Sequence, residues 1–209
     1  MKLQGLYGIT DNSTGKVLIR KVTQAIHGGL SILQYRSKAS DYEQRLDDAL
    51  SLRELCCTYH IPLIINDDIT LAKLIYADGV HLGQHDGSIQ EARRQLGHNA
   101  IIGQSCYNHL HLALQAQAQG ASYAAFGAFF NSPTKPHAPS ASLQTLRMAK
   151  QRLNIPICSI GGITLDNAEQ LIDNGSDMVA VISNLFSAND IEATAKQFSR
   201  QFSAVAASH

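Results

Sequence analysis

Short runs rich in Ile, Val, Leu, Phe and Tyr alternate along this chain with longer stretches whose apolar residues recur at helical spacing. The short runs are typical of buried strands, and the longer pattern is typical of amphipathic helices. Eight strands are expected, at Gly5–Asp11, Ile32–Ser37, Pro62–Asp67, Gly79–Gly83, Ile101–Cys106, Tyr123–Phe130, Pro156–Gly162 and Met178–Asn184. Helices are expected at Val17–Gly28, Tyr42–His60, Leu110–Gln119, Leu143–Leu153 and Asp166–Asn174, with weaker helical patterns at Ile69–Ala77 and Ser88–Leu96 and a last amphipathic helix at Leu185–His209.

The regular alternation of strand and helix predicts a parallel sheet covered by helices. Eight repeats in 209 residues favour an α/β fold of the closed (β/α)8 TIM-barrel type. An open doubly wound sheet is the alternative, but the first strand is not followed by a GxGxxG motif. Without an obvious linker, we expect a single domain over residues 1–209, with a tail that frays from about residue 200.

Composition and charge narrow the range of partners. The chain has 17 Lys and Arg residues against 17 Asp and Glu, and 44% of its residues are hydrophobic, which is typical of a folded domain. Without an excess of positive charge, neither nucleic acid nor a membrane surface is an expected partner. Because the apolar runs fall short of the ~20 residues of a membrane span, we expect a cytoplasmic protein. A homo-oligomer is compatible with the sequence.

The cysteines and histidines show no metal-binding or catalytic motif. Cys56, Cys57, Cys106 and Cys158 lack CxxC spacing, so we expect reduced, buried thiols. The nine histidines give no ligand pattern, and none of them, including His81 within an expected strand, is assigned a catalytic role.

Polar residues gather where the expected strands end, which is where TIM barrels build their active sites. Three cations, Arg36, Lys38 and Lys135, would meet two carboxylates, Asp67 and Asp86, at one rim. This mixture suits a polyphosphate bound through Mg²⁺. On spacing alone, however, the Asp67-Asp68 pair fits a helix N-cap equally well, and a solvated strand end is the better interpretation of residues 34–38 taken in isolation.

A second phosphate site is indicated at the ends of the last two strands. Gly161-Gly162 and Ser183 lie where these barrels often bind a phosphate, because glycine lets backbone N–H groups approach the anion. A tight turn is the more usual meaning of a Gly-Gly pair. The loop with Ser132, Thr134 and Lys135 adds two hydroxyls and a cation, although it also reads as a plain polar turn.

Taken together, several short motifs resemble those of the thiamine phosphate synthase family. They are QYRSK at 34–38, INDD at 65–68, DGVHLGQHD at 78–86, IGQS at 102–105, SPTK at 132–135, SIGGI at 159–163 and VIS at 181–183. The resemblance implies a transferase that joins a hydroxymethylpyrimidine diphosphate to a thiazole phosphate, giving thiamine phosphate and pyrophosphate. The expected partners are therefore two small phosphorylated substrates and Mg²⁺.

The resemblance also implies roles for individual residues. Gln34, Arg36, Lys38, Asn66, Ser105 and Lys135 would hold the pyrimidine diphosphate, with Arg36, Lys38, Lys135 and Ser105 acting in the chemical step. Asp67 and Asp86 would bind Mg²⁺, and Ser132, Thr134, Gly162, Ile182 and Ser183 would bind the thiazole phosphate. The implied reaction is dissociative: the bond from carbon to the diphosphate oxygen breaks first, and the aminopyrimidine stabilises the resulting cation.

Some residues depart from the family pattern, and two other functions are open to the same barrel. Ser132 stands where the family more often has Thr, Tyr107 stands where a His is common, and His85 has no assigned role. A thiazole tautomerase, a sibling on this fold, would need no diphosphate clamp, and a charged pocket without a ligand would be electrostatically costly. A non-catalytic sensor of phosphorylated ligands would bind without forming product.

Overall fold

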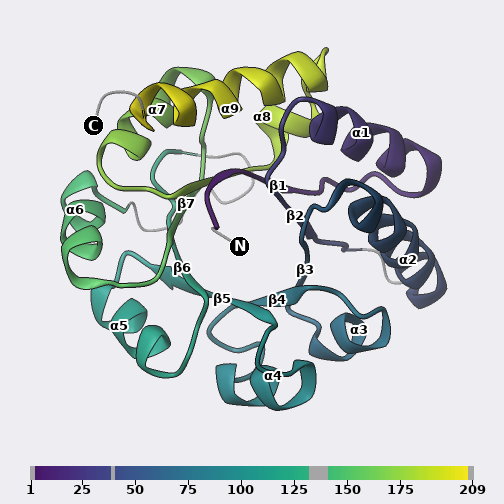
Figure 1. The fold of residues 1–209 in the computed structure, drawn as a ribbon, viewed down its shortest axis with the longest axis horizontal. Coiled ribbons are helices and arrows are strands. Elements are labelled where there is room, and N and C mark those ends of the chain that lie inside the picture. Colours follow the sequence, from purple (N-terminus) through teal and green to yellow (C-terminus); the bar gives the residue numbers. More distant parts are fainter. Residues whose placement is uncertain (1–2, 39–40, 132–140, 207–209) are drawn as a thin grey trace.

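The computed structural model of the protein describes residues 3–38, 41–131 and 141–206. Eight parallel strands close into a barrel in which each strand pairs with the next and β8 pairs with β1. The helices surround this ring of strands (Figure 1). Since the first and last strands are hydrogen-bonded to each other, the sheet is closed, which confirms the predicted (β/α)8 barrel.

All eight expected strands are present, and most are shorter than expected. Their bounds are β1 Gly5–Ile9, β2 Ile32–Tyr35, β3 Leu63–Asn66, β4 Gly79–Leu82, β5 Ile101–Tyr107, β6 Tyr123–Phe126, β7 Ile157–Ile160 and β8 Met178–Val181. The helices in the described ranges are α1 Gly15–His27, α2 Tyr42–Tyr59, α3 Ile69–Leu74, α4 Ile89–Leu96, α5 Leu110–Ala118, α6 Leu143–Arg152, α7 Leu165–Asp173, α8 Ser183–Phe186 and α9 Ile191–Ala206.

The sequence pattern overestimated the sixth strand and the last helix. The strand expected over Tyr123–Phe130 ends at Phe126, and the next residues continue along the end of β7, where the backbone N–H of Phe129 donates to the Ile160 carbonyl at 3.1 Å. The helix expected over Leu185–His209 is interrupted after α8. Asp190 restarts it, because its carboxylate accepts from the backbone N–H of residue 193 at 2.9 Å, as an N-cap residue does.

The last helix is attached to the barrel by buried side chains. Helix α9 continues to residue 206, and the fraying expected from about residue 200 stays a prediction. Phe198 and Phe202 are buried in the hydrophobic core, and the amide of Gln201 donates to the Leu165 carbonyl at 2.9 Å. These contacts attach α9 to the barrel beside α1 and α7 (Figure 1). Residues 207–209 lie outside the described residues.

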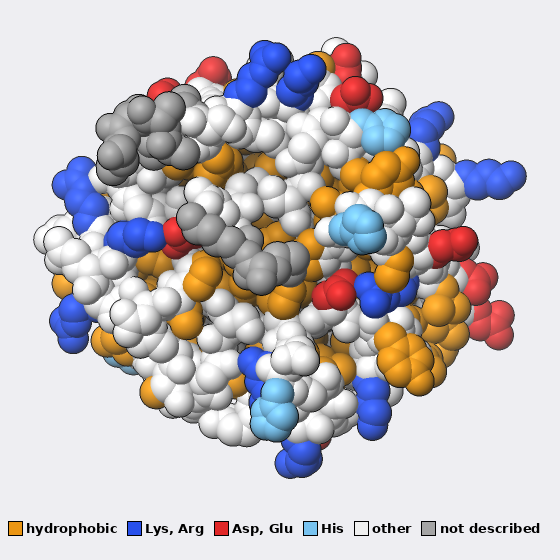
Figure 2. All heavy atoms as spheres, in the orientation of Figure 1, with side chains coloured by type: hydrophobic (Ala, Val, Ile, Leu, Met, Phe, Trp, Pro, Cys, Tyr) orange, Lys and Arg blue, Asp and Glu red, His pale blue; other side chains and the backbone are white. Residues whose placement is uncertain are grey.

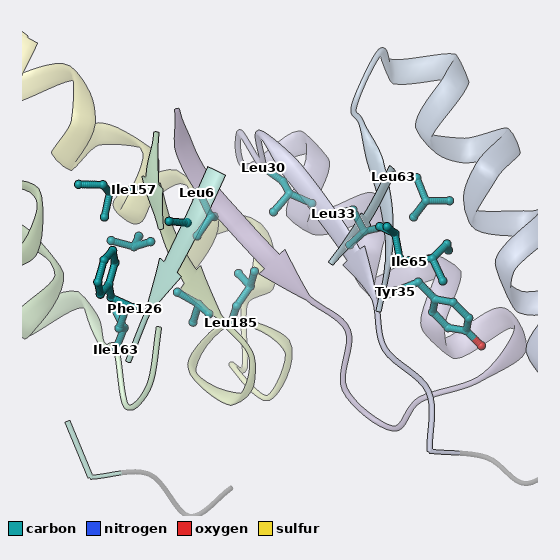
Figure 3. Packing of buried hydrophobic residues seen from close by; sticks show 14 of the residues in the cluster. Leu6, Leu30, Leu33, Tyr35, Leu63, Ile65, Phe126, Ile157, Ile163 and Leu185 are labelled. Carbon is teal, nitrogen blue, oxygen red and sulfur yellow. The ribbon is translucent and has the colours of Figure 1, made fainter. Parts of the chain in front are cut away.

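Successive strand residues point alternately into the barrel and out toward the helices, as the pleat requires. Outward residues such as Leu33, Leu63 and Ile65 belong to the large core between strands and helices (Figure 3). A second, smaller core lies inside the barrel and includes Tyr7 and Tyr123. Inward-facing residues near the strand ends, such as Gln34 and His81, therefore meet side chains of other strands inside the barrel.

Three of the four cysteines are buried, as expected, but Cys57 is exposed. Its position on α2 explains the difference, because Cys56 occupies the side of the helix that packs in the core and the next residue is rotated away. Burial raises the pKa of the Cys56 and Cys106 thiols to about 12. These thiols stay protonated and act as core residues.

Side chains of both charge signs occur around the edge of the face shown in Figure 2, in line with the balanced composition. Among the helices that the structure describes, none is both long and apolar enough to cross a membrane.

Candidate active site

A cavity of about 690 Å³ opens at the end of the barrel where the strands terminate. Its size falls in the range of small-molecule sites. Seven of the residues expected in the site from the sequence line it: Gln34, Arg36, Asn66, Asp67, Asp86, Ser105 and Ile182. A second, more polar cavity of about 540 Å³ shares Asn66, Asp67 and Asp86 with the first.

Asp67 and Asp86 face each other between the two cavities. Burial and then the charge of the Asp86 carboxylate raise the pKa of Asp67 to about 6, while the nearby Arg36 guanidinium acts in the opposite direction. The Asn66 amide donates to Asp67 Oδ2 at 2.5 Å, and Asp86 Oδ2 accepts from the backbone N–H of Gly83 at 3.0 Å. Two carboxylates held this close repel each other, and a bound cation would relieve the repulsion.

The local backbone explains how Asp67 reaches this position. Its φ of 64° is left-handed, a conformation that Asp tolerates better than most residues. Its backbone N–H donates to the His81 carbonyl at 2.8 Å, which continues the pairing of β3 with β4 by one residue. The turn at Asp67 therefore directs its carboxylate across the mouth of the barrel.

The next residue, Asp68, is the helix N-cap that the sequence allowed for the Asp67-Asp68 pair. Its Oδ1 accepts from the backbone N–H of Leu71 at 2.8 Å, which makes it the N-cap of α3. Its Oδ2 accepts from Arg45 at 2.9 Å. Asp68 therefore caps a helix and pairs with an arginine, whereas Asp67 faces the cavity.

Arg36 is held at the end of β2 by the end of β1. The Thr10 hydroxyl donates to the Arg36 carbonyl at 3.1 Å and accepts from the Arg36 backbone N–H at 2.9 Å. Thr10 is buried, so these bonds are shielded from water. They hold the Arg36 backbone where its side chain can line the cavity.

The floor of the cavity is a buried polar cluster that sequence reasoning missed. The Gln34 amide donates to the Tyr7 hydroxyl at 2.9 Å, and the hydroxyls of Tyr7 and Tyr123 are 2.7 Å apart. His81 contacts the Tyr123 hydroxyl through Nδ1 and the Ser105 hydroxyl through Nε2, both at 2.9 Å. The alternation of side chains along a strand could have predicted that His81 points into the barrel. Its hydrogen-bond partners could not be predicted, because they come from other strands that meet only when the barrel closes.

The Gly161-Gly162 pair lies at the end of β7, where the backbone needs glycine at both positions. Their φ angles are 104° and 64°. A Cβ on Gly162 would lie 2.5 Å from the carbonyl oxygen of Asn131. The pair therefore forms the tight turn that is its usual meaning, and Gly161 also lines the cavity.

The other residues that the sequence placed in the site are not among the described residues that line the cavity. Lys38 and Ser183 are exposed, and together with Gly162 they lie outside the part of the cavity lining formed by described residues. Ser132, Thr134 and Lys135 fall outside the described residues. His85 and Tyr107, whose roles the sequence left open, both line the cavity.

The two carboxylates at the cavity are ligands of the kind that Mg²⁺ uses. Within the described ranges, no group of three or more His, Cys, Asp or Glu side chains is arranged to hold a metal ion. Mg²⁺ commonly uses one or two carboxylates and completes its shell with water and substrate phosphate. Asp67 and Asp86 provide such a pair.

Comparison with known proteins assigns a family to this arrangement. The family model described as thiamine monophosphate synthase matches residues 6–185. A thiamine-phosphate synthase from Methylococcus capsulatus is 50% identical over 202 residues, which cover 96% of this chain and 90% of the relative.

Solved structures agree with this result. A thiamine phosphate pyrophosphorylase from Pyrococcus furiosus superposes with a TM-score of 0.87 and 32% identity, over 98% of each chain. A thiamine phosphate pyrophosphorylase from Bacteroides thetaiotaomicron has a TM-score of 0.64 and 17% identity over the full length of both chains, and this match supports the fold alone.

Proposed function

Since this chain belongs to the thiamine monophosphate synthase family and is thereby a transferase of thiamine biosynthesis, we propose a specific reaction and a set of residues that perform it. The substrates are 4-amino-2-methyl-5-hydroxymethylpyrimidine diphosphate and a thiazole ethyl phosphate, with or without a carboxylate. The carbon–oxygen bond to the diphosphate breaks, a carbon–nitrogen bond forms to the thiazole ring, and pyrophosphate leaves. The observation that carries the proposal is the pairing of Asp67 with Asp86 beside Arg36 at a cavity of substrate size.

The diphosphate end of the first substrate would lie at this acidic pair. Asp67 and Asp86 would hold Mg²⁺, which when bound would neutralise the negative charge that builds up on the leaving pyrophosphate. Arg36 lines the same cavity and would contribute a fixed positive charge, and we assign Lys38 and Lys135 the same role. Such preorganised charges are often the largest contribution to catalysis in a site shielded from water.

The pyrimidine ring would lie over the buried cluster, with Gln34, Asn66 and Ser105 contacting its polar atoms. These three side chains line one continuous cavity with the aromatic ring of Tyr123. The electron-rich aminopyrimidine would stabilise the cation left when the carbon–oxygen bond breaks. The attacking nucleophile is the thiazole nitrogen, so this assignment requires no nucleophile from the protein.

The thiazole phosphate would bind on the opposite side of the mouth. Ile182 and Gly161 line the cavity there, and we assign the phosphate to Gly162, Ser183, Ser132 and Thr134. The position of the Gly161-Gly162 turn at the end of β7 supports this choice, because barrels of this type often bind a phosphate after the last two strands. We also propose a cytoplasmic location, since a charged diphosphate does not cross a membrane unaided.

An assay with both precursors tests the proposal. The purified protein is mixed with the pyrimidine diphosphate, the thiazole phosphate and Mg²⁺, and thiamine phosphate is detected by the fluorescence of its oxidised form. We expect product only when both substrates and Mg²⁺ are present, and loss of product with EDTA. Binding of both substrates without product would instead indicate a sensor, and turnover unaffected by EDTA would remove Mg²⁺ from the reaction.

A further inference from the structure

Five side chains from five strands form a continuous line of hydrogen bonds beneath the cavity. The line runs from Gln34 on β2 through Tyr7 on β1, Tyr123 on β6 and His81 on β4 to Ser105 on β5, with successive distances of 2.9, 2.7, 2.9 and 2.9 Å. Only Ser105 is partly exposed, whereas the other four are buried. The line therefore runs along the floor of the cavity and ends at the most exposed of its own hydroxyls.

The direction of the line follows from its buried end. The Gln34 Nε2 atom can only donate, so the Tyr7 oxygen accepts from it. Either tyrosine could donate in the bond between the two hydroxyls, but buried Tyr7 would keep an unpaired hydrogen unless it donates to Tyr123, and we therefore assign that direction. Tyr123 then donates to Nδ1 of His81. A neutral imidazole that accepts at Nδ1 carries its hydrogen at Nε2, and it donates that hydrogen to Ser105.

The two tyrosines keep their hydrogens and their positions. Burial raises the pKa of both phenols, so they are neutral at any physiological pH. The side chain of Tyr123 occupies the space left by Gly103, where a Cβ would lie 2.0 Å from the ring carbon Cζ. The rings of His81 and Tyr123 stack with centroids 5.6 Å apart, which limits rotation of the imidazole.

Ser105 stands at the end of this line with its own hydrogen still to donate. Because its oxygen accepts from His81, the hydroxyl hydrogen points away from the imidazole. The carbonyl of Ser105 accepts from the Gln84 amide at 2.6 Å, which holds the end of β5 in place. The hydroxyl therefore faces the cavity as a hydrogen-bond donor.

We propose that Tyr7, Tyr123 and His81 are positioning residues: with the Gln34 amide at the start of the line, they fix the Nε2–H tautomer of His81 and thereby make Ser105 a hydrogen-bond donor to an acceptor nitrogen of the substrate's pyrimidine ring. The proposal rests on the proposed function for the identity of the ring. The tautomer and the direction of the line rest on the protein alone. A ring that presented C–H or N–H at this point would leave the serine hydroxyl unsatisfied and would bind less well.

The tautomer is measured directly by ¹⁵N NMR of histidine-labelled, ligand-free protein at pH 8. The His81 signals are assigned as those absent from a His81→Asn variant. We expect a protonated Nε2 and an unprotonated Nδ1. A protonated Nδ1, or an imidazolium at this pH, would overturn the proposal.

Kinetics of Tyr123→Phe test whether the line acts through Ser105. We expect the KM for the pyrimidine diphosphate to rise about threefold to tenfold, as for loss of one hydrogen bond, with the KM for the thiazole phosphate unchanged. Tyr59→Phe is the matched control, because it removes a hydroxyl that bonds His27 on the outer helices at 3.2 Å. Equal changes in both KM values would indicate a merely structural role and contradict the proposal.

A double-variant cycle completes the test. If the tyrosine acts through the serine, Ser105→Ala combined with Tyr123→Phe should cost no more than Ser105→Ala alone. Additive losses would show that the two residues act independently. Should the wild-type protein form no thiamine phosphate, the proposed function would fail, whereas the NMR result would still decide the tautomer.

Discussion

Asp67 combines a left-handed backbone with a carboxylate that faces another carboxylate, and both features carry a free-energy cost. The left-handed conformation costs a non-glycine residue about 1 kcal/mol or more, and the charge of Asp86 adds repulsion. The surrounding bonds to Asn66 and His81 hold the residue there in spite of the cost. Such a position is understandable when a cation is to be bound between the two side chains.

The raised pKa of Asp67 predicts a pH-dependent stability in the absence of metal. The pKa of Asp67 in the folded protein, about 6, lies above its ordinary value of 3.8. The Asp67 carboxyl group therefore stabilises the folded state at pH below 4, and this stabilisation is lost as the pH rises through 6. Asparagine also tolerates a left-handed φ, and it does not ionise, so the stability of the Asp67→Asn variant does not fall in this way as the pH rises. Its melting temperature relative to wild type should therefore rise between pH 4 and pH 8, and a difference independent of pH would contradict the assignment.

Removing the other carboxylate should affect turnover more than folding. Asp86→Asn keeps an oxygen that can accept from Gly83 but removes the charge. By analogy with the loss of single stabilising groups in other enzymes, we expect about a hundredfold lower kcat, or on the order of 3 kcal/mol of barrier. Asp47→Asn, on an exposed position of α2, removes the same charge and should leave the rate unchanged. Near-normal turnover of Asp86→Asn at saturating Mg²⁺ would exclude Asp86 from the mechanism.

Strands β5 and β6 are paired so that a glycine on one faces a large aromatic ring on the other. Gly103 is directly opposite Tyr123 in the register, and the tyrosine ring fills the space where a side chain would lie. Because the Tyr123 ring packs over Gly103, its hydroxyl lies inside the barrel, where it contacts His81 and Tyr7. The floor of the cavity thus depends on a strand pair as much as on any single residue.

The Gly103→Ala substitution tests this dependence. Its Cβ would meet the Tyr123 ring at 2.0 Å, so the ring must move. We expect a loss of about 1–3 kcal/mol in the free energy of unfolding, as for other overpacked cores, measured by urea denaturation. The ¹⁵N signals of His81 should also shift. Unchanged stability together with unchanged signals would show that the interior is looser than its packing indicates.

At the scale of the whole molecule, α9 covers the point where the barrel closes. It packs on α1 and α7, the helices that flank the pairing of β1 with β8 (Figure 1). Phe198 on α9 is completely buried in the outer core. Closure of the sheet therefore relies on residues from the last part of the chain.

The Phe198→Ala substitution should weaken this closure. Deleting a buried aromatic side chain typically costs about 3–5 kcal/mol, and we expect a loss of this size in the free energy of unfolding. Tyr76→Ala serves as the control, because Tyr76 is 83% exposed and should contribute little. Equal effects of the two substitutions would contradict the account of α9.

The periodicity of the sequence was sufficient to predict the barrel, because strand and helix repeats report burial directly. It did not locate the break before Ile191 or the end of β6 at Phe126, since both depend on local hydrogen bonds. The same holds for the site. The family resemblance implied that Gln34 belongs to the site, but nothing in the sequence could show that it meets Tyr7 from another strand.

The central claim is that residues from separate loops hold a diphosphate through Mg²⁺. The most direct test is isothermal titration calorimetry with inorganic pyrophosphate, in the presence and absence of Mg²⁺. The titrations are made on the wild-type protein and on the variant that carries both Asp67→Asn and Asp86→Asn. We predict binding by the wild type that depends on Mg²⁺ and is at least about tenfold weaker in the variant. Equal affinity in the two proteins, or binding that ignores Mg²⁺, would contradict the account.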